Sequence, residues 1–264
     1  MNPSVIIEKW DGLLYTIYNY LQYLKSLFSK LPYLNKNKDL ENKHKGERCF
    51  IIMNGPSINA LDLHKLKSEV VFCSNYFYRA EIAKVVDPNY YFWADSKIFF
   101  RPEGKEVVGE IRNTCPNAHL LLNSKAYSSL GYNDNVYYVH CKHIPNVYSI
   151  KTSLSGITSN YSTVAFHAIS AALYMGFDRI YVLGLDFAPG AFKHFVNLGA
   201  ECEDPLQKMS KEDVCGNYWN YTKAHYESYY LQAYAKKHNQ KIINLNSGSY
   251  IRAFEFGDYN TLFK

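Results

Sequence analysis

The stretch CFIIMNGPS, residues 49–57, passes from a continuous apolar run directly into a turn of asparagine, glycine, proline and serine. A run that is apolar on every residue is typical of a strand that helices cover on both faces of a parallel sheet. In the turn, Gly55 allows a ligand to approach the backbone closely, and Ser57 offers a helix cap. Free backbone N–H groups there would favour a phosphate. We therefore expect the first strand of an α/β domain, with a ligand beside Asn54.

Further apolar runs follow along the chain, at residues 70–74, 90–94, 118–123, 136–141, 179–185 and 241–245. Helical patterns lie between them, notably at 161–175 and 219–238. Strands that alternate with helices predict a single Rossmann-like, doubly wound, mostly parallel α/β sheet of about seven strands. Ligands of such sheets bind beyond the carboxyl ends of the strands, so the residues that follow each strand are the candidates for a site.

Residues 1–34 precede this domain and have a different pattern. Between residues 4 and 31, apolar side chains recur at spacings of three and four, which predicts an amphipathic helix that ends before Pro32. These side chains are Ile6, Trp10, Leu13, Ile17, Leu21, Leu24, Phe28 and Leu31. Residues 35–47 are polar and are interpreted as a linker to the domain at 48–264. The helix either packs on the domain or on a second copy, giving a homo-oligomer, or lies on an anionic membrane surface.

Composition excludes several classes of protein. The 264 residues have a formal net charge of +5 without a Lys/Arg cluster of the nucleic-acid-binding kind. Six cysteines without a C-x-x-C pair indicate a reducing compartment. The chain has no signal-peptide pattern and no uninterrupted apolar run of about 18 residues. We expect a cytoplasmic protein, at the inner face of the membrane if the helix binds lipid.

Polar residues follow the second and third strands. Asn75 and Tyr76 come after residues 70–74, and an asparagine supplies both the donor and the acceptor that a base edge or ribose needs. Asp95 follows residues 90–94, where it would either accept from a sugar hydroxyl or cap the next helix. Both residues are candidates for ligand binding, and an ordinary turn or cap remains the alternative for each.

Two later segments complete the candidate site. Ser159, Asn160, Ser162 and Thr163 lie at the entry to the apolar helix at 161–175, and hydroxyl groups at a helix N-terminus form an anion site or simply cap the helix. Asp186 ends the strand at 179–185, where it would bind a ligand or make structural hydrogen bonds. Residues 188–214 are interpreted as a loop or lid over the site, and they include His194.

His225 is the candidate catalytic base, because a histidine titrates near neutral pH and can take a proton from a hydroxyl nucleophile. No Asp-x-Asp pair occurs in the chain, so the usual carboxylate clamp for a metal-bound nucleotide diphosphate is missing. We expect no metal site and no resident cofactor.

In combination these landmarks resemble a known family. The order is Asn54-Gly55-Pro56-Ser57, then Ser74-Asn75-Tyr76-Phe77, then the Ser/Thr-rich segment, then MGFDRIYVLGLDF at 175–187. It resembles the bacterial sialyltransferases of glycosyltransferase family 42, and a wider group of polysaccharide-locus proteins with the same NGPS start. The resemblance covers about residues 48–250.

This resemblance implies metal-independent, inverting transfer of a sialic-acid-like or Kdo-like sugar from a CMP donor to a surface-glycan acceptor. It also implies that Asn54 and Asn75 contact CMP, that the hydroxyl segment meets the donor, and that His225 is the base. Gly156 stands near the place of a family arginine and Ala188 replaces a tyrosine, with His194 the nearest substitute for a second lid tyrosine. These departures leave the donor sugar open.

Two other functions remain open on the sequence. The NGPS and Gly-x-Asp pattern is also similar to pterin pyrophosphokinases, which transfer diphosphate from ATP and would need Asp95 and Asp186 to hold Mg²⁺. A non-catalytic scaffold of polysaccharide assembly would use residues 4–31 as its interaction helix.

Overall fold

A computed structural model describes residues 3–28, 31–100, 103–143, 150–187 and 211–263. Its sheet of nine strands has the order β6-β5-β4-β3-β2-β1-β7-β8-β9, and every neighbouring pair is parallel. The strands are β1 (Arg48–Ile52), β2 (Val70–Ser74), β3 (Tyr90–Trp93), β4 (His119–Asn123), β5 (Val136–Lys142), β6 (Ile157–Ser159), β7 (Arg179–Leu183), β8 (Lys241–Asn244) and β9 (Glu255–Phe256). The Rossmann-like α/β class is confirmed.

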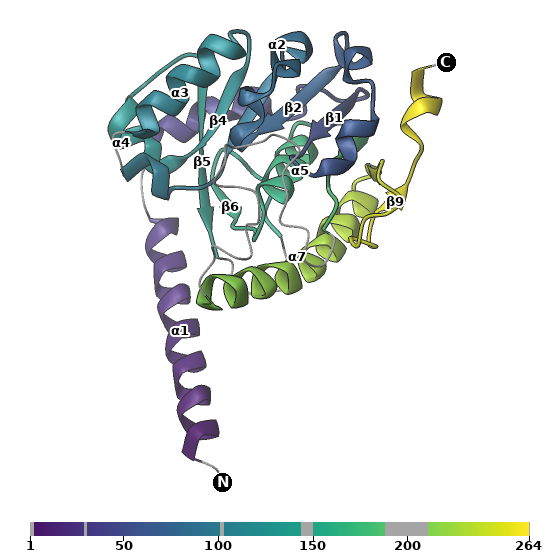
Figure 1. Cartoon of the computed structure of the whole chain (residues 1–264). Coiled ribbons are helices and arrows are strands. Elements are labelled where there is room, and N and C mark those ends of the chain that lie inside the picture. The colour runs from purple at the N-terminus through teal and green to yellow at the C-terminus, as the bar shows by residue number, and fades with distance from the viewer. Residues whose placement is uncertain (1–2, 29–30, 101–102, 144–149, 188–210, 264) are drawn as a thin grey trace.

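Helices cover both faces of this sheet (Figure 1). The described helices are α1 (Pro3–Leu27), α2 (Ile82–Val86), α3 (Glu103–Thr114), α4 (Tyr127–Leu130), α5 (Val164–Tyr174) and α7 (Lys211–Lys237), of which α1 projects away from the sheet. Side chains of β1 alternate between two cores: Cys49 and Ile51 pack in the core that contains α5 and α7, and Phe50 and Ile52 in the core that contains α3. Burial on both faces explains why the strands are apolar on every residue.

The sheet differs from the prediction in its number of strands. All seven predicted strands form, and β6 and β9 add to them, so the number seven was wrong. These two strands have three and two residues, too few for a periodic pattern. The helix α7 also begins at Lys211 rather than at residue 219.

The stretch interpreted as a linker connects α1 to β1 but is packed against the domain. A 3₁₀ helix, η1 (Pro32–Leu40), forms there, and Leu40 and Asn37 are fully buried. The Asn37 amide donates to the backbone carbonyls of Tyr138 and Leu154, both at 2.7 Å. Polar composition concealed this packing, because an asparagine whose amide nitrogen donates to buried carbonyls cannot be told from a solvated one in the sequence.

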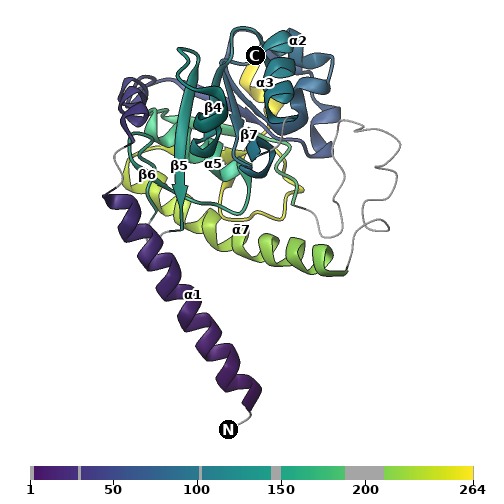
Figure 2. The same cartoon turned by 90° about the vertical axis from the view of Figure 1, so that its left-hand side faces the viewer.

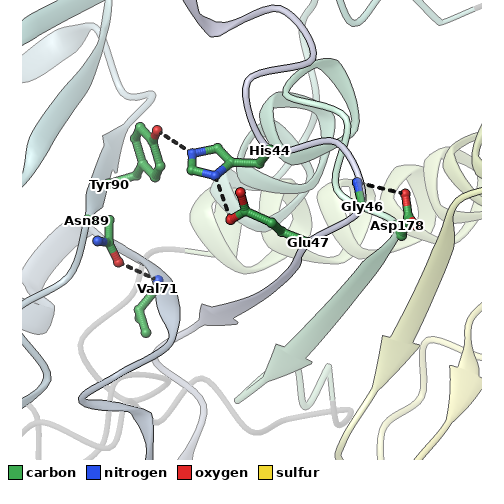
Figure 3. Close-up of polar contacts among 7 residues, drawn as sticks. All are labelled: His44, Gly46, Glu47, Val71, Asn89, Tyr90 and Asp178. Carbon is green, nitrogen blue, oxygen red and sulfur yellow. Dashed lines mark hydrogen bonds and ion pairs between the residues drawn. The ribbon is translucent and has the colours of Figure 1, made fainter.

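Polar contacts close the amino edge of the sheet, opposite the edge where ligands are expected (Figure 3). The His44 ring lies 2.7 Å from the Tyr90 hydroxyl and 3.0 Å from the Glu47 carboxylate. The backbone N–H of Gly46 donates to Asp178, which precedes β7. These contacts fix the chain between η1 and β1. They occupy the amino edge with structural hydrogen bonds, so a ligand site is sought at the carboxyl edge.

Helix α1 stands away from the rest of the chain in both views (Figures 1 and 2). Its last turns approach the sheet, where the Lys151 ammonium lies over the Tyr23 ring, 5.0 Å from its centre. Among the described residues, no helix is long and apolar enough to cross a membrane.

Candidate functional site

The turn after β1 and the segment after β7 touch each other. The Gly55 N–H donates to the Gly184 carbonyl at 3.0 Å. A Cβ atom at Gly55 would lie 2.6 Å from the Asp186 Cγ, and one at Gly184, where φ is +67°, would lie 2.5 Å from the Met53 carbonyl oxygen. Both glycines are therefore needed for the close approach of these two chain segments. At Gly55 it is the segment after β7, and not a ligand, that packs against the backbone.

Asp186 binds the same turn through its carboxylate. The Ser57 N–H donates to Oδ2 at 2.9 Å, the Ser57 hydroxyl donates to Oδ1, and the Asn246 amide donates to Oδ1 at 2.7 Å. The N–H and hydroxyl donors of Ser57 thus already face an anion, so they are not free for a phosphate. We call this contact of Met53–Ser57 with Gly184–Asp186 the closed half of the carboxyl edge.

A polar cavity of about 300 Å³ lies at the other half of this edge, beyond β2, β3, β4 and β6. Its volume is at the low end for small-molecule sites. Eleven residues line it: Asn75, Ala94, Asp95, Ser96, Asn123, Asn160, Tyr161, Ser162, Thr163, Val164 and His167. Five of these are candidates from the sequence, namely Asn75, Asp95, Asn160, Ser162 and Thr163.

Two asparagines follow neighbouring strands at this edge. The Asn54 amide nitrogen is 3.4 Å from the Ser74 carbonyl oxygen, and its Oδ1 is buried without a hydrogen-bond partner among the described residues. An unpaired buried acceptor costs about 1–3 kcal/mol, so a donor from a ligand would be favourable there. Asn75 has a positive φ of +50°, and its carbonyl accepts from the Tyr91 hydroxyl at 2.7 Å.

The start of α5 is held by an acid from α7. Thr163 caps α5 by accepting from the Ala165 N–H at 3.4 Å. The Glu227 carboxylate accepts from the Ser162 N–H at 2.9 Å and from the Ser162 hydroxyl. Burial raises the pKa of Glu227, and the two bonds from Ser162 oppose that rise. A carboxylate at a helix N-terminus is stabilised by the helix dipole, so this contact joins α7 to the cavity wall.

His167, which the sequence analysis did not single out, is buried in the first turns of α5. One ring nitrogen lies 3.6 Å from the Cys141 sulfur, and the other lies 3.3 Å from the backbone nitrogen and oxygen of Tyr161. Burial lowers the pKa of His167 to about 4, so the ring is neutral at neutral pH. With both nitrogens engaged, His167 holds the Tyr161 backbone at the cavity.

His225 does not line the cavity. It is half-buried on α7, and its carbonyl accepts from the Ser228 hydroxyl at 2.6 Å. Glu227, two residues along the helix, points to Ser162, and residues two apart on a helix face different directions. The segment of α7 that carries His225 therefore lies beside the site, with the His225 side chain on another face of the helix.

Two other candidates, Ser159 and Tyr76, do not line the cavity. The Ser159 hydroxyl accepts from the Lys151 N–H at 2.9 Å, which fixes β6. Tyr76 packs against Trp93, with ring centres 5.3 Å apart, in the core that contains α3. His194 lies outside the described residues, as does most of the expected lid. Among the described residues, no group of three or more His, Cys, Asp or Glu could hold a metal ion.

Asn123 lines the cavity, and its position at the end of an apolar run could have identified it from the sequence. It ends β4, so the rule that found Asn75 and Asp95 applies to it as well. Its amide donates to the Ala94 carbonyl at 3.1 Å, and its side-chain oxygen accepts from the Lys125 N–H. Asn123 thus supports the loop that carries Asp95.

No family model and no curated protein matches the chain. Among solved structures, the sialyltransferase CstII from Campylobacter jejuni, in complex with the substrate analogue cytidine-5'-monophosphate, is 16% identical, with a TM-score of 0.48 over 80% of this chain and 85% of its own. The MAf glycosyltransferase from Magnetospirillum magneticum is 14% identical, with a TM-score of 0.48, over 85% of this chain and 38% of its own.

A short-chain dehydrogenase from Oenococcus oeni is 13% identical, with a TM-score of 0.28, over 80% of this chain and 61% of its own. Because all three TM-scores lie below 0.5, these similarities assign no activity to this chain.

Proposed function

We propose that the chain is a glycosyltransferase that binds a nucleotide-sugar donor in the cavity at the carboxyl edge of its sheet. One observation supports this most directly: amide, hydroxyl and carboxylate side chains from several strand ends converge with the first turn of α5 on one cavity. Nucleotides and sugars present many donors and acceptors, and amide and hydroxyl groups can pair with both.

The proposed donor is a CMP-activated sialic-acid-like or Kdo-like sugar, and the acceptor is a surface glycan, as the sequence resemblance implies. The acceptor oxygen bonds to the anomeric carbon, and the bond from that carbon to the CMP phosphate oxygen breaks with its electron pair leaving on CMP. Attack opposite the leaving group inverts the anomeric carbon. Hydrogen-bond donors stabilise the departing phosphate, so the proposed transfer is metal-independent.

Individual roles follow from the lining residues. Asn75 and Asn160 are proposed to contact the nucleotide, and the Thr163 hydroxyl at the start of α5 to meet the phosphate. Both donors of Ser162 are engaged by Glu227, so Ser162 positions this turn rather than binding phosphate. Asp95, which is exposed at the cavity, is proposed to accept from a sugar hydroxyl.

His225 is proposed to take the proton of the acceptor hydroxyl. Its support is the sequence resemblance together with the approach of α7 to the cavity at Glu227. The side chain would have to turn toward the cavity when acceptor and donor are bound, because catalytic contacts are often formed only in the complex.

The test is release of CMP from CMP-sialic acid and from CMP-Kdo by the full-length protein, with EDTA present. We expect turnover that EDTA does not abolish and that His225→Asn lowers at least about 100-fold. His238→Asn, directly after the end of the same helix, is the matched control and keeps full turnover. No CMP release from either donor, with activity only on ATP and Mg²⁺, would instead support diphosphate transfer. No nucleotide binding at all would support the scaffold.

A further inference from the structure

Helix α1 presents a long apolar face that no described part of the chain covers. Leu13, Leu14, Ile17 and Leu21 expose between 46% and 59% of their surface, and Phe28, directly after the helix, exposes 84%. At 100° per residue these side chains fall on one side of the helix. Single exposed apolar residues are ordinary, but a continuous stripe of this length marks an interaction surface.

The opposite side of the helix is polar. Asn19, Gln22 and Ser26 lie there, and the Ser26 hydroxyl donates to the Gln22 carbonyl at 2.8 Å. Only the last turns approach the domain, as both views show (Figures 1 and 2). The apolar face therefore needs a partner from outside the described chain.

Lysines gather where α1 meets the domain. Lys25 is on α1, Lys142 ends β5, and Lys125 precedes α4. Burial first, and then the charges of Lys125 and Lys25, lower the pKa of Lys142, so these cations act on one another. Lys151 lies over the Tyr23 ring, two residues from Lys25. We call Lys25, Lys125, Lys142 and Lys151 the lysine cluster.

The combination of the apolar face and the lysine cluster fits one partner best. We propose that α1 lies in the surface of an anionic lipid bilayer, with its apolar face in the acyl boundary and the lysine cluster against the headgroups. Adjacent pairs such as Leu13–Leu14 and Tyr20–Leu21 make the face wider than the seam of a two-stranded coiled coil. Parallel pairing of two copies would also bring two lysine clusters together.

The first test is co-sedimentation of the full-length protein, without nucleotide, with phosphatidylcholine vesicles and with mixed phosphatidylcholine–phosphatidylglycerol vesicles. We expect binding to the mixed vesicles and much weaker binding to phosphatidylcholine alone. The double variant Ile17→Glu/Leu21→Glu lowers the partition coefficient at least about 100-fold. Its matched control, Asn19→Glu/Gln22→Glu, adds the same charge to the polar side and lowers it roughly tenfold or less.

The second test addresses the cations. Lys125→Gln/Lys142→Gln lowers the partition coefficient on mixed vesicles roughly 10- to 30-fold and leaves binding to phosphatidylcholine unchanged. Ile17 and Leu21 are exposed, whereas Asn19 and Gln22 are half-buried, so an unchanged melting temperature of each variant verifies that the domain is folded. Equal binding to both vesicle types, or binding to neither, would overturn the proposal. Light scattering that shows a dimer lost in Ile17→Glu/Leu21→Glu would identify a second copy as the partner instead.

Discussion

The two halves of the carboxyl edge contain similar residues and use them differently. At β1 and β7, the Gly55 and Ser57 donors are paired with Gly184 and Asp186, so these donors are not free for a ligand. At β2, β3, β4 and β6, asparagines and hydroxyls line an open cavity instead. A polar residue after a parallel strand is therefore a candidate ligand contact only when the chain itself has not already paired it.

The largest expected effect is on the stability of the closed half. Gly55→Ala places a methyl group within 2.6 Å of the Asp186 Cγ, and it should lower the free energy of unfolding by at least about 3 kcal/mol. Chemical denaturation measures this loss. Gly109→Ala is the matched control, because nothing lies within 4 Å of its Cβ position in α3, and it should be neutral or stabilising. A denaturation midpoint for Gly55→Ala equal to that of the wild type would show that the turn after β1 and the segment after β7 do not touch.

The two aspartates at the edge should separate stability from binding. Asp186→Asn weakens three hydrogen bonds to a carboxylate and should cost about 2–3 kcal/mol of unfolding free energy. Asp95→Asn, at the exposed cavity rim, should cost less than about 1 kcal/mol while it lowers donor affinity. Denaturation and donor titration of both variants check this. A larger loss of unfolding free energy in Asp95→Asn, together with a loss of donor affinity only in Asp186→Asn, would mean that the closed half binds the donor and the cavity half is structural.

The buried His167 in the cavity wall should make the free energy of unfolding fall as the pH is lowered below neutral. The pKa of His167 is lowered to about 4 in the folded chain, so between about 6.5 and 4 the unfolded chain binds a proton that the folded chain does not. Stability is therefore lost as the pH falls through this window, by about 2 kcal/mol from pH 7 to pH 5 for this residue. His167→Asn should remove that part of the pH dependence, measured by denaturation at both pH values.

The matched control for that experiment is His64→Asn, at an exposed position before β2. It should keep the wild-type pH dependence. An unchanged dependence in His167→Asn would mean that His167 is not buried in its neutral form.

The fold was predictable because its strands are long apolar runs. Residues 49–53 and 179–185 differ from polar neighbours over enough positions to identify a strand, whereas β6 and β9 are too short. The packed 35–47 stretch was missed, since the partners of Asn37 lie about a hundred residues away. Long-range pairing of this kind leaves no local pattern.

The lining of the cavity was predictable where it follows strand ends. Asn75 and Asp95 were found by that rule, and Asn123 would have been found by it as well. Glu227 was not, because it reaches Ser162 across 65 residues through the packing of two helices. Gly55 shows a second limit: a glycine serves the close approach of a ligand and of another chain segment equally well, and sequence alone does not distinguish them.

The most direct test of the central claim is a calorimetric titration of the protein with CMP in the presence of EDTA. We predict saturable binding that Asn160→Ala weakens about tenfold, since it removes an exposed cavity amide without disturbing the core. Asn135→Ala, directly before β5 on the opposite edge, should bind CMP as the wild type does. No binding of CMP by the wild type, or equal binding by all three proteins, would contradict a nucleotide site in this cavity.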